Sequence, residues 1–439
     1  MSTFDGERLP ASTFKLDSER LRSGWYSDKY FSNILRTLQG NAAAGPGAGY
    51  LPGEAWVELQ VFTRRQPRSL LVGMDKALAI LKEGCGYFEG GRFVPTWSEL
   101  EVEALQDGEW LAYGGDPLEV EPALRIRGRY RDFALLETPL LGVLTRGTRI
   151  ATNVYEVLEA ARGKPVLFFP ARFDAHEIQA ADGYAYQIAV QRYRLDAGRP
   201  GPDPQISTDA QGDWWGGAGG GTVAHSLIAC YLGDTAGAML DFARYVPSEV
   251  PRIALVDFNN DCLGESLQVA RVLWEEHIRR RRSGDPEADR FRLDGVRPDT
   301  AATLRDRSVE PLGDPRLDLG VNPRLVFQLH SALRSAYLAW ELLPGEQELA
   351  RAFCARIRIV VTGGFSAERI RAFERLGVPA DVYGVGSSLL SNSQKEGTTN
   401  DFTADVVRVR LPGGWREVAK AGRRAVSSSR LRPVDLAWL

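Results

Sequence analysis

From about residue 130 the sequence alternates between short apolar runs and longer stretches with helical spacing. Strands are expected at 166–169, 253–257, 292–297, 356–361 and 381–385, and helices at 175–190, 224–246, 263–282, 323–343 and 367–376. Continuous apolar strands that alternate with amphipathic helices form a parallel sheet covered by helices. The pattern therefore predicts an α/β fold, with an irregular (β/α) barrel as the catalytic domain over residues 129–403.

The two ends of the chain follow a different pattern. Residues 1–128 mix short strands and loops with one helical piece at 74–81, whereas residues 404–439 contain a strand, a Leu411-Pro-Gly-Gly turn and a second strand. We expect the C-terminal strands to pair with the N-terminal ones. Residues 1–128 plus 404–439 would then form a discontinuous α+β domain. The segments 198–221 and 283–320 are predicted to be insertions.

The charge balance argues against a protein that works mainly by coating a polyanion. The 439 residues include 54 Lys+Arg and 57 Asp+Glu, a formal net charge of −3, whereas binding to nucleic acid or an anionic membrane depends on positive charge. No apolar run reaches the roughly 18 residues of a membrane span. Glu7 and Arg8 are not followed by the apolar core of a signal peptide. We therefore expect a soluble cytoplasmic protein that binds neither nucleic acid nor membrane.

The four cysteines, Cys85, Cys230, Cys262 and Cys354, are scattered without a metal-binding spacing. Buried free thiols in a reducing compartment are the expected state. No metal site built from protein ligands alone is predicted.

Polar residues follow the predicted strands at the point where each strand ends. Arg172 and Asp257 follow the first two strands, and Arg297 with Asp299 follows the third. In parallel α/β barrels the catalytic residues collect where the strands end and the loops to the next helices begin. The sequence therefore predicts one functional face that brings these side chains together.

Glycine-rich loops follow the last two predicted strands, Thr362-Gly-Gly364 after one and Gly384-Val-Gly-Ser-Ser388 at the end of the other. Glycines allow the backbone to approach an anion closely, and the loops after the last barrel strands are a recurrent phosphate site. A phosphate monoester site is the favoured interpretation, and tight turns without a ligand are the alternative.

A third glycine-rich run, Gly219-Gly-Gly-Thr-Val-Ala-His225-Ser226, enters a predicted helix. It lacks the lysine of a P-loop. His225 is expected about one turn into the helix, where it can face a bound phosphate. The pattern alone supports a catalytic histidine and a buried structural one equally.

Taken in order, eight short motifs of this chain resemble the nicotinate phosphoribosyltransferase family and, more distantly, its nicotinamide-using relatives. The resemblance covers residues 25–424. The motifs are Ser27-Asp-Lys-Tyr-Phe31, Leu136-Glu-Thr-Pro-Leu-Leu141, Phe169-Pro-Ala-Arg172, Gly221-Thr-Val-Ala-His-Ser226, Val256-Asp257, Val296-Arg-Pro-Asp299, Thr362-Gly-Gly364 and Tyr383-Gly-Val-Gly386.

The resemblance implies transfer of a phosphoribosyl group from phosphoribosyl pyrophosphate to nicotinate, which yields nicotinate mononucleotide and pyrophosphate in the salvage route to NAD. It also implies a split N-terminal domain, a homodimer or higher homo-oligomer with shared active sites, and Mg²⁺ that accompanies pyrophosphate or ATP. ATP would be a co-substrate, coupled through a phosphorylated histidine at His225.

The resemblance also assigns roles to individual residues. Tyr30, reaching across the dimer, and Phe169 would stack on the pyridine ring, Arg172 would bind its carboxylate, and Arg297 would bind phosphate oxygens. Asp257 and Asp299 would face the ribose and could hold Mg²⁺ through water, and Thr222 belongs with the substrate-binding residues. The phosphate-binding positions are Gly363, Gly364, Gly384, Gly386, Ser387 and Ser388.

The sequence also departs from the family pattern. The aspartate expected near the ring has only Asp209 as a candidate, and the residues after Asp299 are Thr-Ala-Ala. Nicotinamide therefore remains an alternative acceptor, while quinolinate would need a more basic pocket. A phosphosugar lyase or isomerase of barrel fold would need a catalytic Lys or Glu at a strand end. A non-catalytic scaffold would leave the polar strand ends unexplained.

Overall fold

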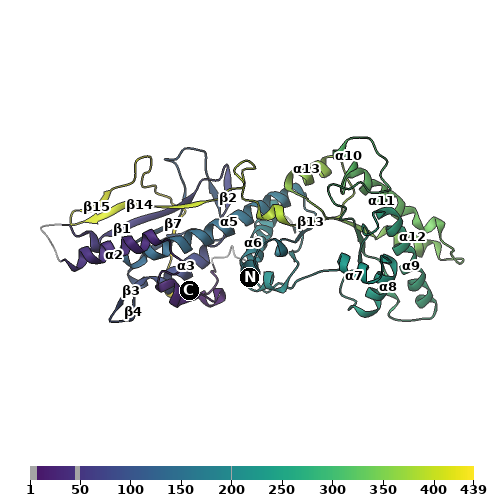
Figure 1. The fold of residues 1–439 in the computed structure, drawn as a ribbon, viewed down its shortest axis with the longest axis horizontal. Helices are drawn as coiled ribbons and strands as arrows, with labels where there is room; N and C mark the ends of the chain where they lie inside the picture. The colour runs from purple at the N-terminus through teal and green to yellow at the C-terminus, as the bar shows by residue number, and fades with distance from the viewer. Residues whose placement is uncertain (1–6, 45–49, 199) are drawn as a thin grey trace.

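A computed structural model describes residues 7–44, 50–198 and 200–439. The described chain is elongated. Figure 1 shows the N-terminal sheet and α2 (Lys29–Ala43) at one end and helices α8 (Thr235–Tyr245) and α9 (Cys262–Arg282) at the other. Between them lie α6 (Gln179–Ala197) and β13 (Val382–Val385).

The N-terminal sheet is antiparallel and combines both ends of the chain. Its strand order is β15-β14-β1-β7-β5-β16. Leu59 in the central strand β1 lies opposite Val406 of β14 on one side and Ile126 of β7 on the other. The expected pairing of C-terminal with N-terminal strands is therefore confirmed. The strands are β1 (Trp56–Thr63), β5 (Glu101–Ala104), β7 (Pro122–Arg129), β14 (Phe402–Leu411), β15 (Gly414–Glu417) and β16 (Arg432–Pro433).

The second sheet is parallel, with strand order β10-β11-β12-β13-β8-β9. This order runs through the chain and returns from β13 to β8, so the sheet curls like a barrel that stays open between β9 and β10. The predicted α/β fold with an irregular barrel is confirmed. The remaining strands are β8 (Val166–Phe168), β9 (Gln205–Ile206), β10 (Ile253–Leu255), β11 (Gly295–Arg297) and β12 (Arg358–Val361).

Two sequence-based expectations about this region are wrong. The segment 198–221 is not a plain insertion, because it contributes the edge strand β9. The helix expected over 224–246 is split into α7 (His225–Cys230) and α8. Leu232 and Gly233 adopt left-handed conformations with φ of 56° and 89°, and Asp234 then caps α8 by accepting from the N–H of Gly237 at 3.0 Å.

The remaining helices cover the sheets and the junction between them. These helices are α1 (Ser18–Arg22), α3 (Met74–Gly84), α4 (Tyr130–Phe133), α5 (Glu137–Ala160), α10 (Pro315–Asp318), α11 (Pro323–Ser335), α12 (Gln347–Ala355) and α13 (Ala367–Arg375). Helix α3 confirms the helical piece predicted at 74–81. Four short strands form two antiparallel pairs: β2 (Arg68–Leu70) with β6 (Trp110–Ala112), and the hairpin of β3 (Gly86–Glu89) with β4 (Arg92–Pro95).

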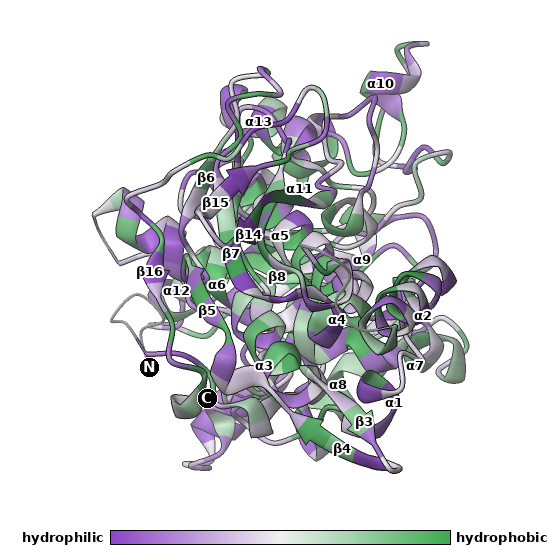
Figure 2. Cartoon of the chain, turned by 90° about the vertical axis from the view of Figure 1, so that its left-hand side faces the viewer, coloured by the Kyte–Doolittle hydropathy of each residue, from purple (hydrophilic) through white to green (hydrophobic). Residues whose placement is uncertain are grey.

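Helix α5 joins the two hydrophobic cores. Its Leu140 and Leu144 belong to the core under the antiparallel sheet, whereas Ile150 and Val154 belong to the core of the parallel sheet. Figure 2 shows α5 among hydrophobic residues near the centre of the view, with the hydrophilic α10 at the periphery. One continuous helix thus holds the two sheets in a defined arrangement.

The structure also bears on the expected state of the cysteines and on the expected absence of a membrane span. All four cysteines are free, but Cys230 is exposed, whereas the other three are buried as expected. Within the described ranges, none of the helices has the length and apolar character to cross a membrane.

Candidate active site

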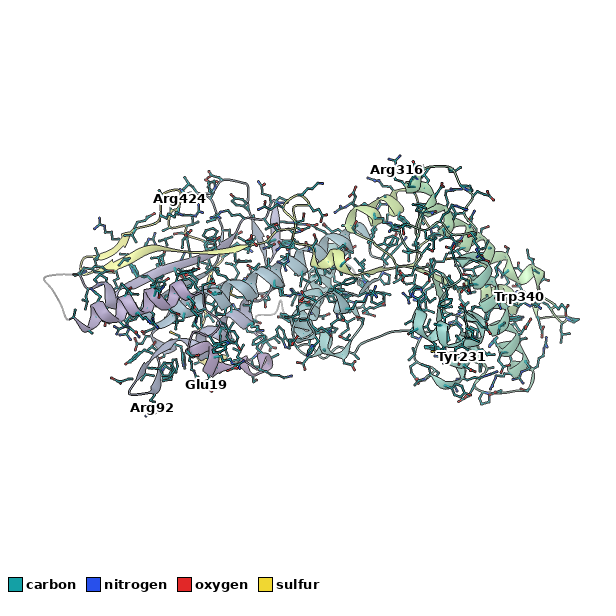
Figure 3. The ribbon with its side chains drawn as sticks, in the orientation of Figure 1. Glu19, Arg92, Tyr231, Arg316, Trp340 and Arg424 are labelled. Atoms are coloured by element: carbon teal, nitrogen blue, oxygen red, sulfur yellow. The ribbon has the colours of Figure 1, made fainter. Side chains whose placement is uncertain are left out.

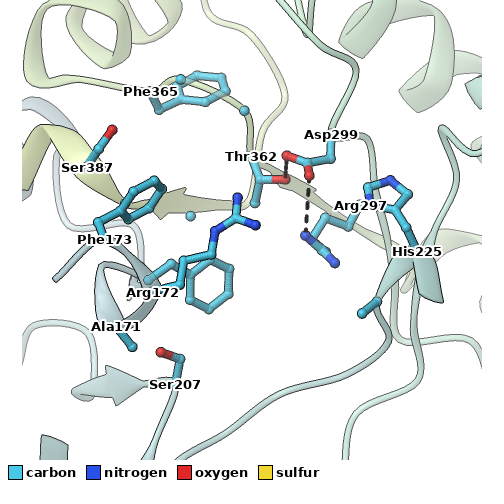
Figure 4. Close-up of a pocket in the computed structure, with 16 residues that line it drawn as sticks. Ala171, Arg172, Phe173, Ser207, His225, Arg297, Asp299, Thr362, Phe365 and Ser387 are labelled. Carbon is cyan, nitrogen blue, oxygen red and sulfur yellow. Dashed lines mark hydrogen bonds and ion pairs between the residues drawn. The ribbon is translucent and has the colours of Figure 1, made fainter. Parts of the chain in front are cut away.

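The carboxyl ends of the parallel strands surround one cavity of about 360 Å³ (Figure 4). Loops that follow β8, β11, β12 and β13 contribute to it, together with the start of α7. Its lining residues are Phe169, Ala171, Arg172, Phe173, Ser207, Ala224, His225, Arg297, Asp299, Thr362, Gly363, Gly364, Phe365, Gly384, Gly386 and Ser387. Most of the site residues expected from the sequence therefore meet in one place.

Four predicted residues lie outside this lining. Asp257 is bonded to His225 at the cavity edge, and Thr222 lines a neighbouring cavity of about 450 Å³ that lies deeper in the curled sheet. The Ser388 hydroxyl donates to the carbonyl oxygen of Phe365 at 2.8 Å. Tyr30 lies on α2 in the N-terminal part, with 57% of its surface exposed.

Arg172 extends into the cavity from the turn that follows β8. Its guanidinium carbon is 5.2 Å from the ring centroid of Phe173, and Figure 4 shows it facing Arg297 across the cavity. No carboxylate of the described chain forms an ion pair with Arg172. A planar guanidinium beside aromatic rings can take a ligand carboxylate in bidentate fashion.

Arg297 is held in a fixed orientation at the opposite wall. Its Nη2 donates to the carbonyl oxygen of Val223 at 2.9 Å, and Nη1 lies 4.0 Å from Oδ2 of Asp299. Burial lowers the pKa of Arg297, and the nearby Asp299 and Asp257 oppose that shift. Asp299 in turn accepts a hydrogen bond of 2.6 Å from the Thr362 hydroxyl. The cavity thus contains two guanidinium groups but little free negative charge.

His225 and Asp257 form a bonded pair at the mouth of the cavity. Nε2 of His225 lies 3.1 and 3.2 Å from the two carboxylate oxygens. The side chain of His225 is 47% exposed and that of Asp257 only 9%. Burial raises the pKa of Asp257, and His225 counteracts this shift. His225 is the first residue of α7 rather than one turn inside a helix, so its imidazole is more accessible than expected.

The glycine loops present unused backbone N–H groups. Gly363 and Gly364 have φ values of 89° and 69°, which favour glycine. The N–H groups of Gly364, Phe365, Ser387 and Ser388 donate to no other residue in the part of the chain that the structure describes. Successive free N–H groups in such turns form a concave site for anions. At Gly384, a Cβ atom would lie 2.5 Å from Thr362, so the tight packing requires glycine there.

The Trp214–Trp215 loop belongs to none of the eight sequence motifs and packs against the N-terminal part of the chain. The ring of Trp214 packs 4.9 Å from that of Phe14 and 5.1 Å from the ammonium group of Lys76. Nε1 of Trp215 donates to the carbonyl oxygen of Gln211 at 2.8 Å. Asp209 accepts from the N–H of Gly219 at 2.8 Å, so its carboxylate supports the same loop. These contacts fix the segment that leads to His225.

Sequence reasoning missed the two aromatic residues Phe173 and Phe365. Phe173 is 46% exposed beside Arg172, whereas Phe365 is 2% exposed and lines the cavity next to Gly363 and Gly364. Both directly follow a predicted site residue, Arg172 or Gly364, and this position could have identified them as cavity residues. Across the described ranges, no three His, Cys, Asp or Glu side chains are grouped in a way that could hold a metal ion.

The chain is similar to a curated enzyme over most of its length. The chain is 25% identical over 385 residues to nicotinate phosphoribosyltransferase pncB1 of Mycobacterium tuberculosis, which covers 84% of this chain and 70% of the relative. No protein-family model matches the chain.

Solved structures share the fold. The crystal structure of nicotinate-nucleotide pyrophosphorylase from Pyrococcus furiosus aligns with a TM-score of 0.65 and 24% identity, over 93% of this chain and 80% of the other. Human nicotinic acid phosphoribosyltransferase aligns with a TM-score of 0.55 and 17% identity, over 89% and 77%. The two-sheet architecture is therefore that of the type II phosphoribosyltransferases.

Proposed function

We propose that this chain, which is 25% identical to a nicotinate phosphoribosyltransferase, transfers the phosphoribosyl group of phosphoribosyl pyrophosphate to nicotinate. The products would be nicotinate mononucleotide and pyrophosphate. One cavity carries the proposal: it combines Arg172, which forms no ion pair among the described residues, with N–H groups of the two glycine loops that likewise have no partner there.

The chemistry of the acceptor suits this cavity. A pyridine nitrogen has a free lone pair at neutral pH, so the enzyme needs no general base and has only to hold the ring. Phe169 and Phe173 offer flat surfaces for the ring, worth roughly 0.5–1.5 kcal/mol for each stacked pair, and Arg172 offers the partner for its carboxylate. The preference for nicotinate over nicotinamide rests on this charge pairing.

The donor would lie along the opposite wall. The 5′-phosphate would accept from the N–H groups of the glycine loops, and Arg297 would bind pyrophosphate oxygens. Positive charge develops at the ribose carbon C1 as pyrophosphate leaves, and the carboxylates of Asp257 and Asp299 are placed to stabilise such a charge.

We also propose that Mg²⁺ binds together with pyrophosphate. It keeps most of its waters and takes one or two carboxylates together with substrate phosphates. Asp257 and Asp299 fit that requirement, because they are close enough for Asp299 to raise the pKa of Asp257. When bound, the ion would neutralise charge on the departing pyrophosphate.

Coupling to ATP is proposed through His225. Its Nε2 is bonded to Asp257, so Nδ1 is the nitrogen free to accept a phosphoryl group. We expect His225→Ala to abolish stimulation by ATP while ATP-independent turnover persists, measured as nicotinate mononucleotide formed with and without ATP. His330→Ala, which alters a histidine of α11 outside the cavity, serves as the control. Full ATP stimulation in His225→Ala would remove this role.

We propose a homodimer in which Tyr30 reaches the cavity of the partner, because Tyr30 is exposed and lies outside the cavity of its own protomer. Tyr30→Ala and Arg172→Ala should each have a reduced kcat/KM for nicotinate as homodimers. Mixing the two after dissociation should restore part of the activity, since some mixed dimers then contain one intact site. Absence of any recovery, with mixed dimers verified by mass, would contradict a shared site.

The basic residues near the C-terminus are compatible with the same arrangement. Arg424 lies over the N-terminal sheet (Figure 3), where it pairs with Glu119 at 3.8 Å, and Arg423 is bonded to Asp405. Neither lines the cavity of its own protomer, so we assign them no contact with the substrate there.

The decisive experiment is an assay of pyrophosphate release with nicotinate, nicotinamide and quinolinate as separate acceptors, with and without ATP. Nicotinate should be the preferred acceptor and should require phosphoribosyl pyrophosphate and Mg²⁺. Turnover with none of the three pyridines would exclude the proposed function. Preference for nicotinamide would assign the nearest alternative.

A further inference from the structure

Arg369 of α13 lies directly behind the loop formed by Gly363 and Gly364. Its Nη1 donates to the carbonyl oxygens of Gly363 at 2.6 Å and Gly364 at 3.2 Å, and Nη2 donates to that of Val321 at 2.6 Å. The guanidinium carbon also lies 4.3 Å from the ring centroid of Phe365. One side chain therefore holds two successive peptide units of the loop and ties them to the segment before α11.

These contacts determine where the N–H groups of the loop point. In a trans peptide the carbonyl and the N–H of the same unit point in opposite directions. Because the carbonyls of Gly363 and Gly364 face Arg369, the N–H groups of Gly364 and Phe365 face away from it. Gly363, Gly364 and Phe365 line the cavity and Arg369 does not, so the guanidinium lies on the rear side of the loop.

The charge of Arg369 is not balanced by an acidic side chain. In the ranges that the structure describes, no carboxylate forms an ion pair with it, and burial alone lowers its pKa. Arg369 is partly buried, and a partly buried cation without a counter-ion carries a desolvation cost. An anion bound on the other side of the loop would reduce that cost.

We propose that Arg369 is a positioning residue for a phosphate monoester, which turns the N–H groups of Gly364 and Phe365 toward the cavity and whose charge is compensated when the phosphate binds. The identity of that phosphate as the 5′-phosphate of phosphoribosyl pyrophosphate rests on the proposed function. The phosphate site itself does not depend on the reaction.

The test measures binding of ribose 5-phosphate and of pyrophosphate by calorimetry. Arg369→Gln should weaken binding of ribose 5-phosphate about tenfold, because charge and orientation are both lost, and should leave pyrophosphate binding unchanged. Arg369→Lys retains the charge but cannot bridge three carbonyls, so a loss of about threefold is expected. Arg334→Lys is the matched control, since Arg334 of α11 also donates to two backbone carbonyls, those of Cys354 and Ile357.

The outcomes separate this inference from the proposed function. Equal binding of ribose 5-phosphate by the wild-type protein and both Arg369 variants would overturn the inference, as would an equal loss for both ligands or no binding by the wild type. If the wild type binds ribose 5-phosphate but forms no nucleotide from any pyridine, the proposed function fails and the Arg369 inference stands. If Arg369→Gln does not fold, Arg369→Lys decides.

Discussion

Arg297→Lys is expected to lower kcat/KM for phosphoribosyl pyrophosphate by about 100-fold, equivalent to about 2.7 kcal/mol of transition-state stabilisation. The guanidinium fork of Arg297 can donate to the Val223 carbonyl and still present other N–H groups to a phosphate. A lysine ammonium group cannot do both in this enclosed position, and hydrogen bonds between charged groups contribute roughly 1.5–3 kcal/mol. Initial rates of pyrophosphate release at varied donor concentration measure the change.

The control is again Arg334→Lys, which replaces an arginine bonded to carbonyls outside the cavity. It should reproduce any general effect of the substitution on stability without affecting kcat/KM. A decrease of less than threefold in Arg297→Lys, with unchanged thermal unfolding, would mean that Arg297 does not contact the donor.

Arg172→Lys is expected to raise KM for nicotinate about tenfold or more, because loss of a bidentate contact costs about 1.4 kcal/mol or above. KM for phosphoribosyl pyrophosphate should stay within about twofold in the same titrations, since Arg172 is assigned to the acceptor. Turnover with nicotinamide should change less than turnover with nicotinate. An unchanged KM for nicotinate would place the carboxylate elsewhere in the cavity.

The sequence predicted the elements of the fold better than their ends. The five barrel strands expected from apolar runs are all present, but each is shorter by at least one residue, for example Gly295–Arg297 in place of 292–297. Apolar runs report which residues are buried, and burial continues beyond the last hydrogen-bonded pair. Strand β9 was missed because its two residues, Gln205 and Ile206, are too few to produce a pattern.

The break between α7 and α8 shows that apolar periodicity does not predict where a helix is interrupted. Helical spacing of apolar residues continues across Leu232, yet the backbone turns left-handed there. Gly233 and Asp234 carried a recognisable stop and start signal, which the apolar periodicity outweighed. The expected single helix is therefore two helices, with His225 at the start of the short first one.

The spacing of residues in α13 would place Arg369 on the solvent-exposed surface. It lies on α13, where Glu368 and Arg371 also alternate with the buried Ile370, and nothing in that spacing distinguishes it from a solvated cation. Its contacts with Gly363, Gly364 and Val321 depend on how α13 packs behind a loop and beside a segment 48 residues away.

By itself, the sequence determined the layering of the molecule and the set of residues that occupy strand ends, because periodicity records which face of each element is buried. Only the tertiary structure decided which of those residues pair. His225 bonds Asp257 across 32 positions and Arg297 bonds Val223 across 74. Such pairings depend on backbone turns and on packing between elements distant in the chain, and neither leaves a periodic trace in the local sequence.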